Sequence, residues 1–165
     1  MFQSIKKVTK NIIPFMVLAT ALHVEAKDMS QIDIATNYYD SLYKGDYSTV
    51  RQLASSDLIF KDPTAPEGYG VPNQIDSLNN FVEFFEANSQ GPMQVSYAEK
   101  FASNDQVVLQ VQLKGVVPAN MVGMGEGSVE YISNGFTVIH MSNGKVMSHT
   151  DYIDYSGTKL TKLDD

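Results

Sequence analysis

The 165-residue chain contains no cysteine and no tryptophan, and only three histidines. Without cysteine no disulfide framework can replace a hydrophobic core, so packing alone must stabilise the fold. A closed zinc site normally needs four cysteine or histidine ligands, and the chain is too poor in both to supply them. We therefore expect neither a metal nor a cofactor.

Positive charge is also scarce. Lysine and arginine number 12 against 19 aspartate and glutamate residues, a formal net charge of −7. Phosphate backbones and anionic lipid surfaces would repel such a chain. We expect no nucleic-acid partner and no membrane-surface partner.

Long apolar runs are absent except near the N-terminus. There three lysines in the first ten residues precede an apolar stretch over 12–22, and Ala26 is a small residue at a plausible cleavage position. This layout predicts a secretory signal peptide over residues 1–26. A membrane anchor is the alternative, but the stretch is about half the ~20 residues a spanning helix needs and contains Pro14. The prediction is a periplasmic or secreted protein whose single domain covers residues 27–165.

Helical signals dominate the first half of that domain. Ser30 and Asp33 have the spacing of a capping box, and apolar residues then recur at helical spacing until Gly45. Asp46 is placed to cap a second, short helix, and Asn73 to open a third that ends near 91.

Alternating apolar residues dominate the second half. They indicate antiparallel strands over 95–101 and 107–113, and Asn143-Gly144 predicts a tight hairpin near the C-terminus. The segment 133–135 is compatible with a tight turn or a bulge. The glycine-rich segment 115–127 is expected to be a flexible connection whose methionines could close over a ligand.

Helices followed by strands indicate an α+β domain, in which a curved antiparallel sheet wraps around three N-terminal helices as a cone. Such a sheet tends to leave a ligand pocket at its wide end.

Asp62 is the most informative candidate residue. It alternates with Leu58 and Phe60 on a short strand that ends at Pro63, so its carboxylate should face the apolar interior. Burying an unpaired charge is unfavourable, so such an aspartate is paired, protonated or placed for acid/base work on a ligand, and a cavity is the simplest explanation. The alternative is a turn former, because Asp-Pro commonly ends a strand.

Several short motifs together resemble the nuclear transport factor 2-like superfamily, and within it the SnoaL-like polyketide cyclases and the ketosteroid isomerases. The motifs are Asn37-Tyr38-Tyr39-Asp40, Gly45-Asp46, Phe60-Lys61-Asp62-Pro63 and the ending from Phe136 through Asn143-Gly144 to Asp154. The resemblance implies the cone-shaped cystatin-like α+β roll, and a homodimer formed through the outer sheet face.

The resemblance to ketosteroid isomerase implies that Asp62 is the catalytic base and that Tyr38 donates a hydrogen bond to the developing enolate. In that family the second donor is a protonated carboxylic acid. In this chain Phe136 stands at the position where the acid is expected. The loss of one such donor disfavours true steroid isomerisation.

Asp151 matches the aspartate on the last strand of several SnoaL-like cyclases and of limonene epoxide hydrolase. His149 shares its strand face, so the two side chains can orient each other for acid/base chemistry. The alternative is that this face meets solvent. The arginine and aspartate pair of the epoxide hydrolases is missing from 128–141, which disfavours epoxide opening.

The sequence thus predicts three catalytic residues, Asp62, Tyr38 and Asp151, and a pocket lined by Phe60, Phe85, Tyr97, Phe136 and His149. The first hypothesis is an exported enzyme that isomerises or cyclises an apolar carbonyl compound. The second is a non-catalytic binding module for a small apolar molecule, and the third is a dimeric interaction domain.

Overall fold

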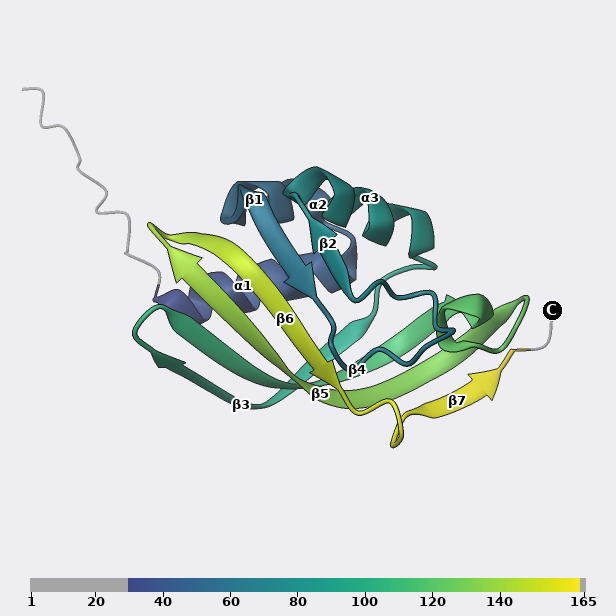
Figure 1. Ribbon diagram of the computed structural model, residues 1–165. Helices are drawn as coiled ribbons and strands as arrows, with labels where there is room; N and C mark the ends of the chain where they lie inside the picture. Colours follow the sequence, from purple (N-terminus) through teal and green to yellow (C-terminus); the bar gives the residue numbers. More distant parts are fainter. Residues whose placement is uncertain (1–29, 164–165) are drawn as a thin grey trace, which may run out of the picture.

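The computed structural model describes residues 30–163, and its helices all lie on one side of a strongly curved sheet (Figure 1). The helices are α1 (Gln31–Lys44), α2 (Tyr47–Leu53) and α3 (Leu78–Asn88), with a short 3-10 turn, η1 (Ala119–Val122). The strands are β1 (Ala54–Lys61), β2 (Gln74–Asp76), β3 (Gln94–Ser103), β4 (Gln106–Pro118), β5 (Ser128–Ser142), β6 (Lys145–Ile153) and β7 (Lys159–Lys162). The predicted signal peptide, residues 1–26, lies outside the described residues.

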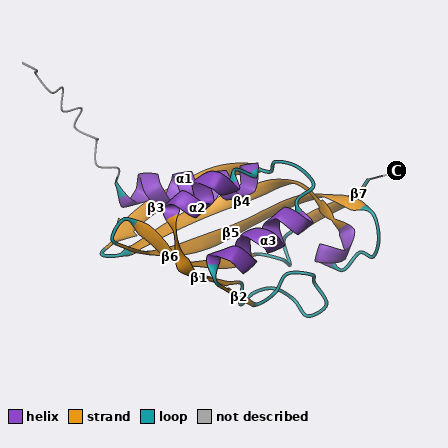
Figure 2. Cartoon of the chain, turned by 90° about the horizontal axis from the view of Figure 1, so that it is seen from above, coloured by secondary structure: helices purple, strands orange, loops and turns teal. Residues whose placement is uncertain are grey.

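The sheet has seven strands in the order β2-β1-β6-β5-β4-β3, and β7 pairs with β5. Seen from above, the three helices lie over the sheet (Figure 2). The prediction of an α+β domain with a curved sheet around three helices is confirmed. The sheet is mixed, however, because β1 runs parallel to β6 and aligns Phe60 with His149. This long-range pairing brings the end of β1 beside the end of β6, and it has no local sequence signal.

The first helix begins and ends where its capping residues predict. The Ser30 hydroxyl accepts a hydrogen bond from the backbone N–H of Asp33 at 3.2 Å, and the Asp33 side chain accepts one from the Ser30 N–H. Gly45 ends the helix in the left-handed conformation, with φ of 79°. The apolar face of α1 packs on the sheet.

The third helix begins later than predicted. Residues before it form β2, in which Ile75 pairs with Phe60, so Asn73 does not open the helix. Ser77, with φ of 74°, is the N-cap, and its side chain accepts from the Asn80 N–H. Pairing with β1 therefore overrides the helical spacing of Ile75.

The long strand β5 resolves the ambiguity at 133–135. These residues lie within a continuous strand that contains neither a turn nor a shift of register toward β4. A Cβ at Gly135 would lie 2.7 Å from the Tyr152 carbonyl oxygen, so glycine permits the close approach of β6. A register shift does occur in β3 between Tyr97 and Glu99, and it leaves Phe101 half exposed.

The predicted flexible connection is shorter than 115–127, because β4 continues to Pro118 and η1 follows. Ala119 and Val122 of η1 are buried. The segment therefore packs as part of the wall of the domain.

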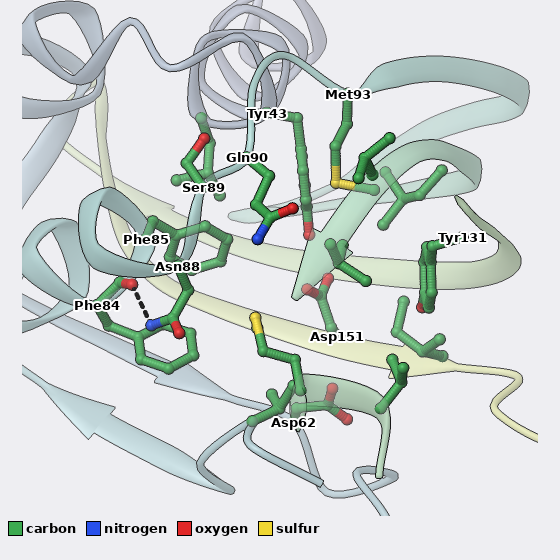
Figure 3. A pocket seen from close by; sticks show the side chains of 18 of the residues that line it. Tyr43, Asp62, Phe84, Phe85, Asn88, Ser89, Gln90, Met93, Tyr131 and Asp151 are labelled. Atoms are coloured by element: carbon green, nitrogen blue, oxygen red, sulfur yellow. Dashed lines mark hydrogen bonds between the residues drawn. The ribbon is translucent and has the colours of Figure 1, made fainter. Parts of the chain in front are cut away.

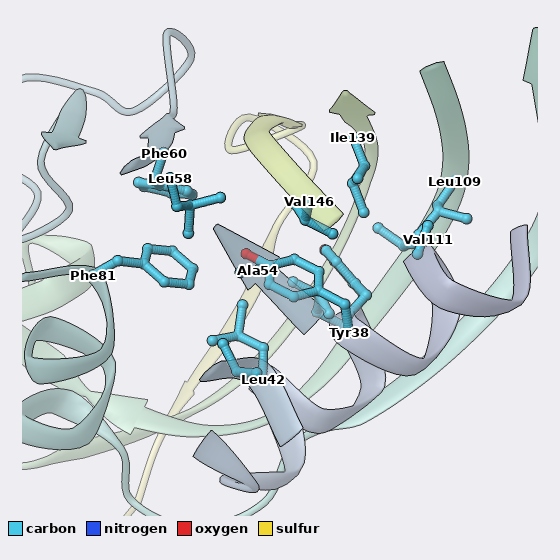
Figure 4. Close-up of a cluster of buried hydrophobic side chains, with 14 of the residues drawn as sticks. Tyr38, Leu42, Ala54, Leu58, Phe60, Phe81, Leu109, Val111, Ile139 and Val146 are labelled. Atoms are coloured by element: carbon cyan, nitrogen blue, oxygen red, sulfur yellow. The ribbon is translucent and has the colours of Figure 1, made fainter. Parts of the chain in front are cut away.

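The hydrophobic core fills the space between the helices and the concave face of the sheet. Figure 4 shows Tyr38 and Leu42 of α1 and Phe81 of α3 packed against strand residues such as Phe60 and Val146. One end of this space is left open as a cavity.

Candidate functional site

A cavity of about 110 Å³ lies beside the core, between α1, α3, η1 and the concave face of strands β1 and β4 to β6. Most of its wall is apolar or aromatic. The apolar and aromatic side chains on the wall include Tyr43, Phe60, Phe85, Met93, Met121 and Tyr131. Figure 3 shows several of these side chains around the empty space.

Two carboxylates belong to the cavity wall. Asp62 follows β1 and Asp151 lies on β6, and their exposed fractions are 2% and 3%. They are adjacent in space because β1 and β6 pair in parallel, with Lys61 opposite Thr150. Among the described residues no lysine, arginine or histidine lines the cavity. The site is therefore apolar with two buried acids.

The Asp62 carboxylate is fully engaged by hydrogen-bond donors. Its Oδ1 accepts from the Thr64 N–H at 3.1 Å and the Thr64 hydroxyl at 2.7 Å, and its Oδ2 accepts from the Tyr155 hydroxyl at 2.6 Å. Thr64 Oγ1 in turn accepts from the Ile153 N–H at 2.9 Å. This network ties the loop after β1 to the end of β6.

Tyr155 responds to this environment. Its pKa is raised well above the ordinary value, first by burial and then by the hydrogen bond to Asp62 and the negative charge there. The hydroxyl therefore remains a donor at any physiological pH.

The Asp151 carboxylate is engaged on one oxygen only. Its Oδ1 accepts from the Thr137 hydroxyl at 2.5 Å and from His149 Nε2 at 2.8 Å. Its Oδ2 accepts no hydrogen bond from the described residues, and Figure 3 shows the side chain pointing into the cavity. One oxygen is thus held from behind while the other is available to a ligand.

His149 links Asp151 to the core. The ring is fully buried, and its Nδ1 lies 3.2 Å from the Tyr38 hydroxyl. Burial, followed by the charge of Asp151, raises the pKa of Tyr38 well above its ordinary value, so Tyr38 stays protonated. In the neutral imidazole, Tyr38 donates to Nδ1 and Nε2–H donates to Asp151. The expected pairing of His149 with Asp151 is present, and this strand face is buried instead of meeting solvent.

Four predicted residues reach the cavity: Asp62, Asp151, Phe60 and Phe85. Tyr38 and His149 do not line it and lie behind Asp151 instead. Tyr97 also lies outside the wall, and its hydroxyl donates to Asp40 Oδ1 at 2.6 Å. The predicted site therefore needs correction at Tyr38, Tyr97 and His149, because none of the three lines the cavity.

The placement of Phe136 in the pocket is wrong. Its side chain is 46% exposed on the outer face of β5, whereas Gly135 and Thr137 are buried. Because side chains alternate along a strand, a count that is off by one residue moves a side chain to the opposite face. The inward neighbours are a glycine and a threonine, so neither of them supplies the second acid.

Four tyrosines on the wall were not identified as site residues from the sequence: Tyr43, Tyr47, Tyr131 and Tyr155. Tyr43 lies one helical turn after Tyr39, which is the only local signal for its direction. Burial raises the pKa of Tyr131 to about 12. Tyr131 and Tyr155 reach the cavity through the pairing of β5 and the turn after β6, which the sequence pattern does not specify.

Residues 30–163 contain neither a metal-binding cluster nor a membrane-spanning helix. No group of three or more histidine, aspartate or glutamate side chains could hold a metal ion in this part of the chain. No helix in the same range has the length and apolar character needed to cross a membrane.

Solved structures with the same fold include an epoxide hydrolase and a designed binder. A Shewanella putrefaciens protein described as SnoaL-like aligns with a TM-score of 0.64 and 22% identity over 78% of this chain and 93% of that chain. A limonene-epoxide-hydrolase-like (LEH-like) epoxide hydrolase from M. tuberculosis aligns with a TM-score of 0.56 and 17% identity, covering 76% and 83%. A computationally designed 17-OHP binder aligns with a TM-score of 0.62 and 10% identity, covering 79% and 95%. At these identities the likeness shows the fold alone.

Sequence comparison gives the family. No curated protein matches the chain. The family model described as SnoaL-like polyketide cyclase matches residues 32–160, which includes every element from α1 into β7 and both cavity carboxylates. The chain shares its fold with a Burkholderia pseudomallei protein described as NTF2-like, and by the family model it belongs to the SnoaL-like polyketide cyclase family.

Proposed function

We propose that this protein is a cofactor-independent enzyme that moves a proton on a small apolar carbonyl compound, in an isomerisation or a cyclisation. The observation that carries the proposal is the Asp151 carboxylate, held by two donors on one oxygen and open to an apolar cavity on the other. A general base needs a free acceptor atom within reach of the substrate proton. Asp151 Oδ2 is such an atom.

Asp151 also has a means of staying oriented during proton transfer. Thr137 and His149 bind the same oxygen, and Tyr38 fixes the imidazole from the other side. A base whose rotamer is locked by neighbours keeps the reacting geometry without further ordering.

The hydroxyls of Tyr43 and Tyr131 are the donors available to a substrate oxygen. Both residues line the cavity, and Figure 3 shows Tyr43 extending from α1 toward Asp151. Burial is the largest cause of the raised pKa of each, so both remain protonated donors. They take the role that the sequence assigned to Tyr38.

Asp62, the base expected from the sequence, has a different position in the proposal. Three donors already occupy its carboxylate: a proton taken up on Oδ2 would compete with the Tyr155 hydroxyl, and rotation toward a substrate would break all three hydrogen bonds. We assign Asp62 to holding the cavity wall, with proton transfer assigned to Asp151.

The test is hydrogen–deuterium exchange at the carbon next to the carbonyl of cyclohexanone, followed by NMR. We expect exchange catalysed by the wild type, and a loss of about 10²- to 10⁴-fold in Asp151→Asn. Glu130→Gln is the matched control, because Glu130 is a partly exposed acid on β5 that lies outside the cavity wall and pairs with Lys114. A full loss in Asp62→Asn with an unchanged Asp151→Asn would reverse the two assignments.

A binding module without catalysis is the second candidate. It is favoured by the absence of an acid at the inward positions of β5 beside Asp151, which removes one expected donor to an enolate. In that case the cavity would retain a small ketone without exchanging its protons. Measurable affinity with an exchange rate equal to that of buffer would select this candidate.

We also propose that the protein is exported and that it forms a homodimer. Export is supported by the lysine-rich and apolar character of residues 1–26, and the mass of the protein purified from expressing cells would reveal cleavage after Ala26. A homodimer through the outer sheet face is supported by the half-exposed Phe136 and Tyr152, which are opposite each other on β5 and β6. Sedimentation of the purified protein tests it.

A further inference from the structure

We propose that this cavity also binds a small amine in its protonated form, whose ammonium group pairs with the free oxygen of Asp151. The inference goes beyond the proposed function, because an ammonium group on that oxygen occupies the acceptor atom that the base needs and so excludes the ketone. It follows from the charges on the wall, the aromatic character of the wall and the size of the cavity.

The charge on the wall is unbalanced. Asp62 and Asp151 are both almost fully buried, and the described residues place no lysine, arginine or histidine on the cavity surface. The donors to Asp62 are an N–H and two hydroxyls, and Asp151 Oδ2 has no donor among the described residues. His149 behind Asp151 supplies at most one positive charge for two buried carboxylates, so a ligand that brings a cation would be bound in preference to a neutral one.

The remaining polar groups on the wall do not alter this balance. Asn88 and Gln90 carry neutral amides, of which Asn88 already donates to the Phe84 carbonyl oxygen at 2.8 Å. The side chains of Tyr43 and Tyr131 are neutral as well, since burial keeps them protonated. An anionic ligand would therefore meet two carboxylates and no cation.

Aromatic faces surround the two acids. Tyr43, Phe60, Phe85 and Tyr131 line the same space, and Phe60 and Phe85 pack edge to face with ring centroids 6.1 Å apart. Aromatic rings attract a cation that lies within about 6 Å of the ring centre. Carboxylates and aromatic rings together form the wall that ammonium groups prefer.

The volume limits the ligand to a single ring. The cavity measures about 110 Å³. An apolar protein cavity of about 150 Å³ holds one benzene molecule. A monocyclic amine is therefore larger than the resting cavity, and its ring enters only if the wall moves outward.

The test is titration calorimetry of the wild-type protein with three probes of equal size: benzylamine, benzyl alcohol and benzoate. We expect benzylamine to bind at least about 10-fold more tightly than benzyl alcohol, and benzoate to bind more weakly than both. Benzyl alcohol or benzoate binding as tightly as benzylamine overturns the proposal, and so does an absence of benzylamine binding at about 10 mM.

Variants locate the effect. Asp151→Asn should reduce benzylamine affinity to that of benzyl alcohol, whereas Glu130→Gln removes a partly exposed charge outside the cavity and should leave it unchanged. A benzylamine preference that persists in Asp151→Asn contradicts the assigned contact. The wild-type comparison stands even if the variant fails to fold.

The two proposals fail in different ways. Loss of the benzylamine preference with Asp151-dependent exchange of cyclohexanone refutes the amine and retains the enzyme. A clear benzylamine preference with no catalysed exchange retains the amine-binding cavity and refutes the enzyme.

Discussion

The two buried carboxylates of the cavity differ in how much of each is left for a ligand. Asp62 has three donors spread over both oxygens, and these donors connect the loop after β1 with the turn after β6. Asp151 has both of its donors on one oxygen, and they belong to the strands behind it. Equal burial therefore does not mean equal function. The acid with an unoccupied oxygen is suited to chemistry, and the fully occupied acid is suited to holding the wall.

The largest expected effect on stability is at Asp62. Asp62→Ala leaves the Tyr155 hydroxyl and the Thr64 donors without a partner, so we expect the free energy of unfolding to fall by about 2–4 kcal/mol. Asp151→Ala should lower it less, because fewer donors lose a partner. Urea denaturation of both variants measures the difference, and an equal loss would remove the distinction between the two acids.

The buried tyrosines near Asp62 and Asp151 should make the free energy of unfolding fall at alkaline pH. The folded-state pKa of Tyr38, Tyr131 and Tyr155 is raised, in each case first by burial. The stability that these groups contribute is complete below the unfolded pKa of about 10 and is lost as the pH rises toward their folded values. Between pH 10 and 12, Tyr131 alone should lower the free energy of unfolding by about 1.4 kcal/mol per pH unit.

Denaturation at a series of alkaline pH values checks this slope. Tyr155→Phe at the Asp62 end and Tyr38→Phe at the Asp151 end should each make the slope shallower. A slope that neither variant changes would show that these hydroxyls ionise in the folded state as they do in the unfolded chain.

His149 should affect the rate more than the affinity for substrate. His149→Gln keeps a polar side chain but cannot span the distance between the Tyr38 hydroxyl and Asp151 in the same way. We expect kcat for ketone exchange to fall about 10-fold with KM within about two-fold. An equal change in both parameters would point to a general distortion of the cavity. Tyr38→Phe, which removes only the outer hydrogen bond, should have a smaller effect of the same kind.

The smallest effect is expected outside the cavity. Phe136→Ser changes a half-exposed side chain on the outer sheet face, so we expect the exchange rate to be unchanged and the monomer's unfolding free energy to shift by less than about 0.5 kcal/mol. A large loss of exchange in this variant would contradict the outward direction of Phe136. A change in oligomeric state alone would support the proposed dimer face.

Local signals in the sequence were sufficient for much of the fold. Ser30, Asp33 and Gly45 act within a few residues of their own position, and so the ends of α1 followed from them. The alternation of Val107, Leu109, Val111 and Leu113 likewise gave the buried face of β4. The start of α3 did not follow, because Ile75 pairs with a strand that is 15 residues away in the chain.

The site divides in the same way. The chain by itself indicated that Asp62 faces inward and that Asp151 shares a strand face with His149, because strand alternation is a local property of the backbone. That this face is buried was decided by the tertiary structure. The chain did not determine the direction of Phe136, since the register of β5 depends on its partners on both sides. Only the tertiary structure decided which oxygens are occupied. The donors to the two carboxylates come from Thr137 and Tyr155 as well as from neighbours in sequence, and distant segments meet only when the sheet closes over the helices.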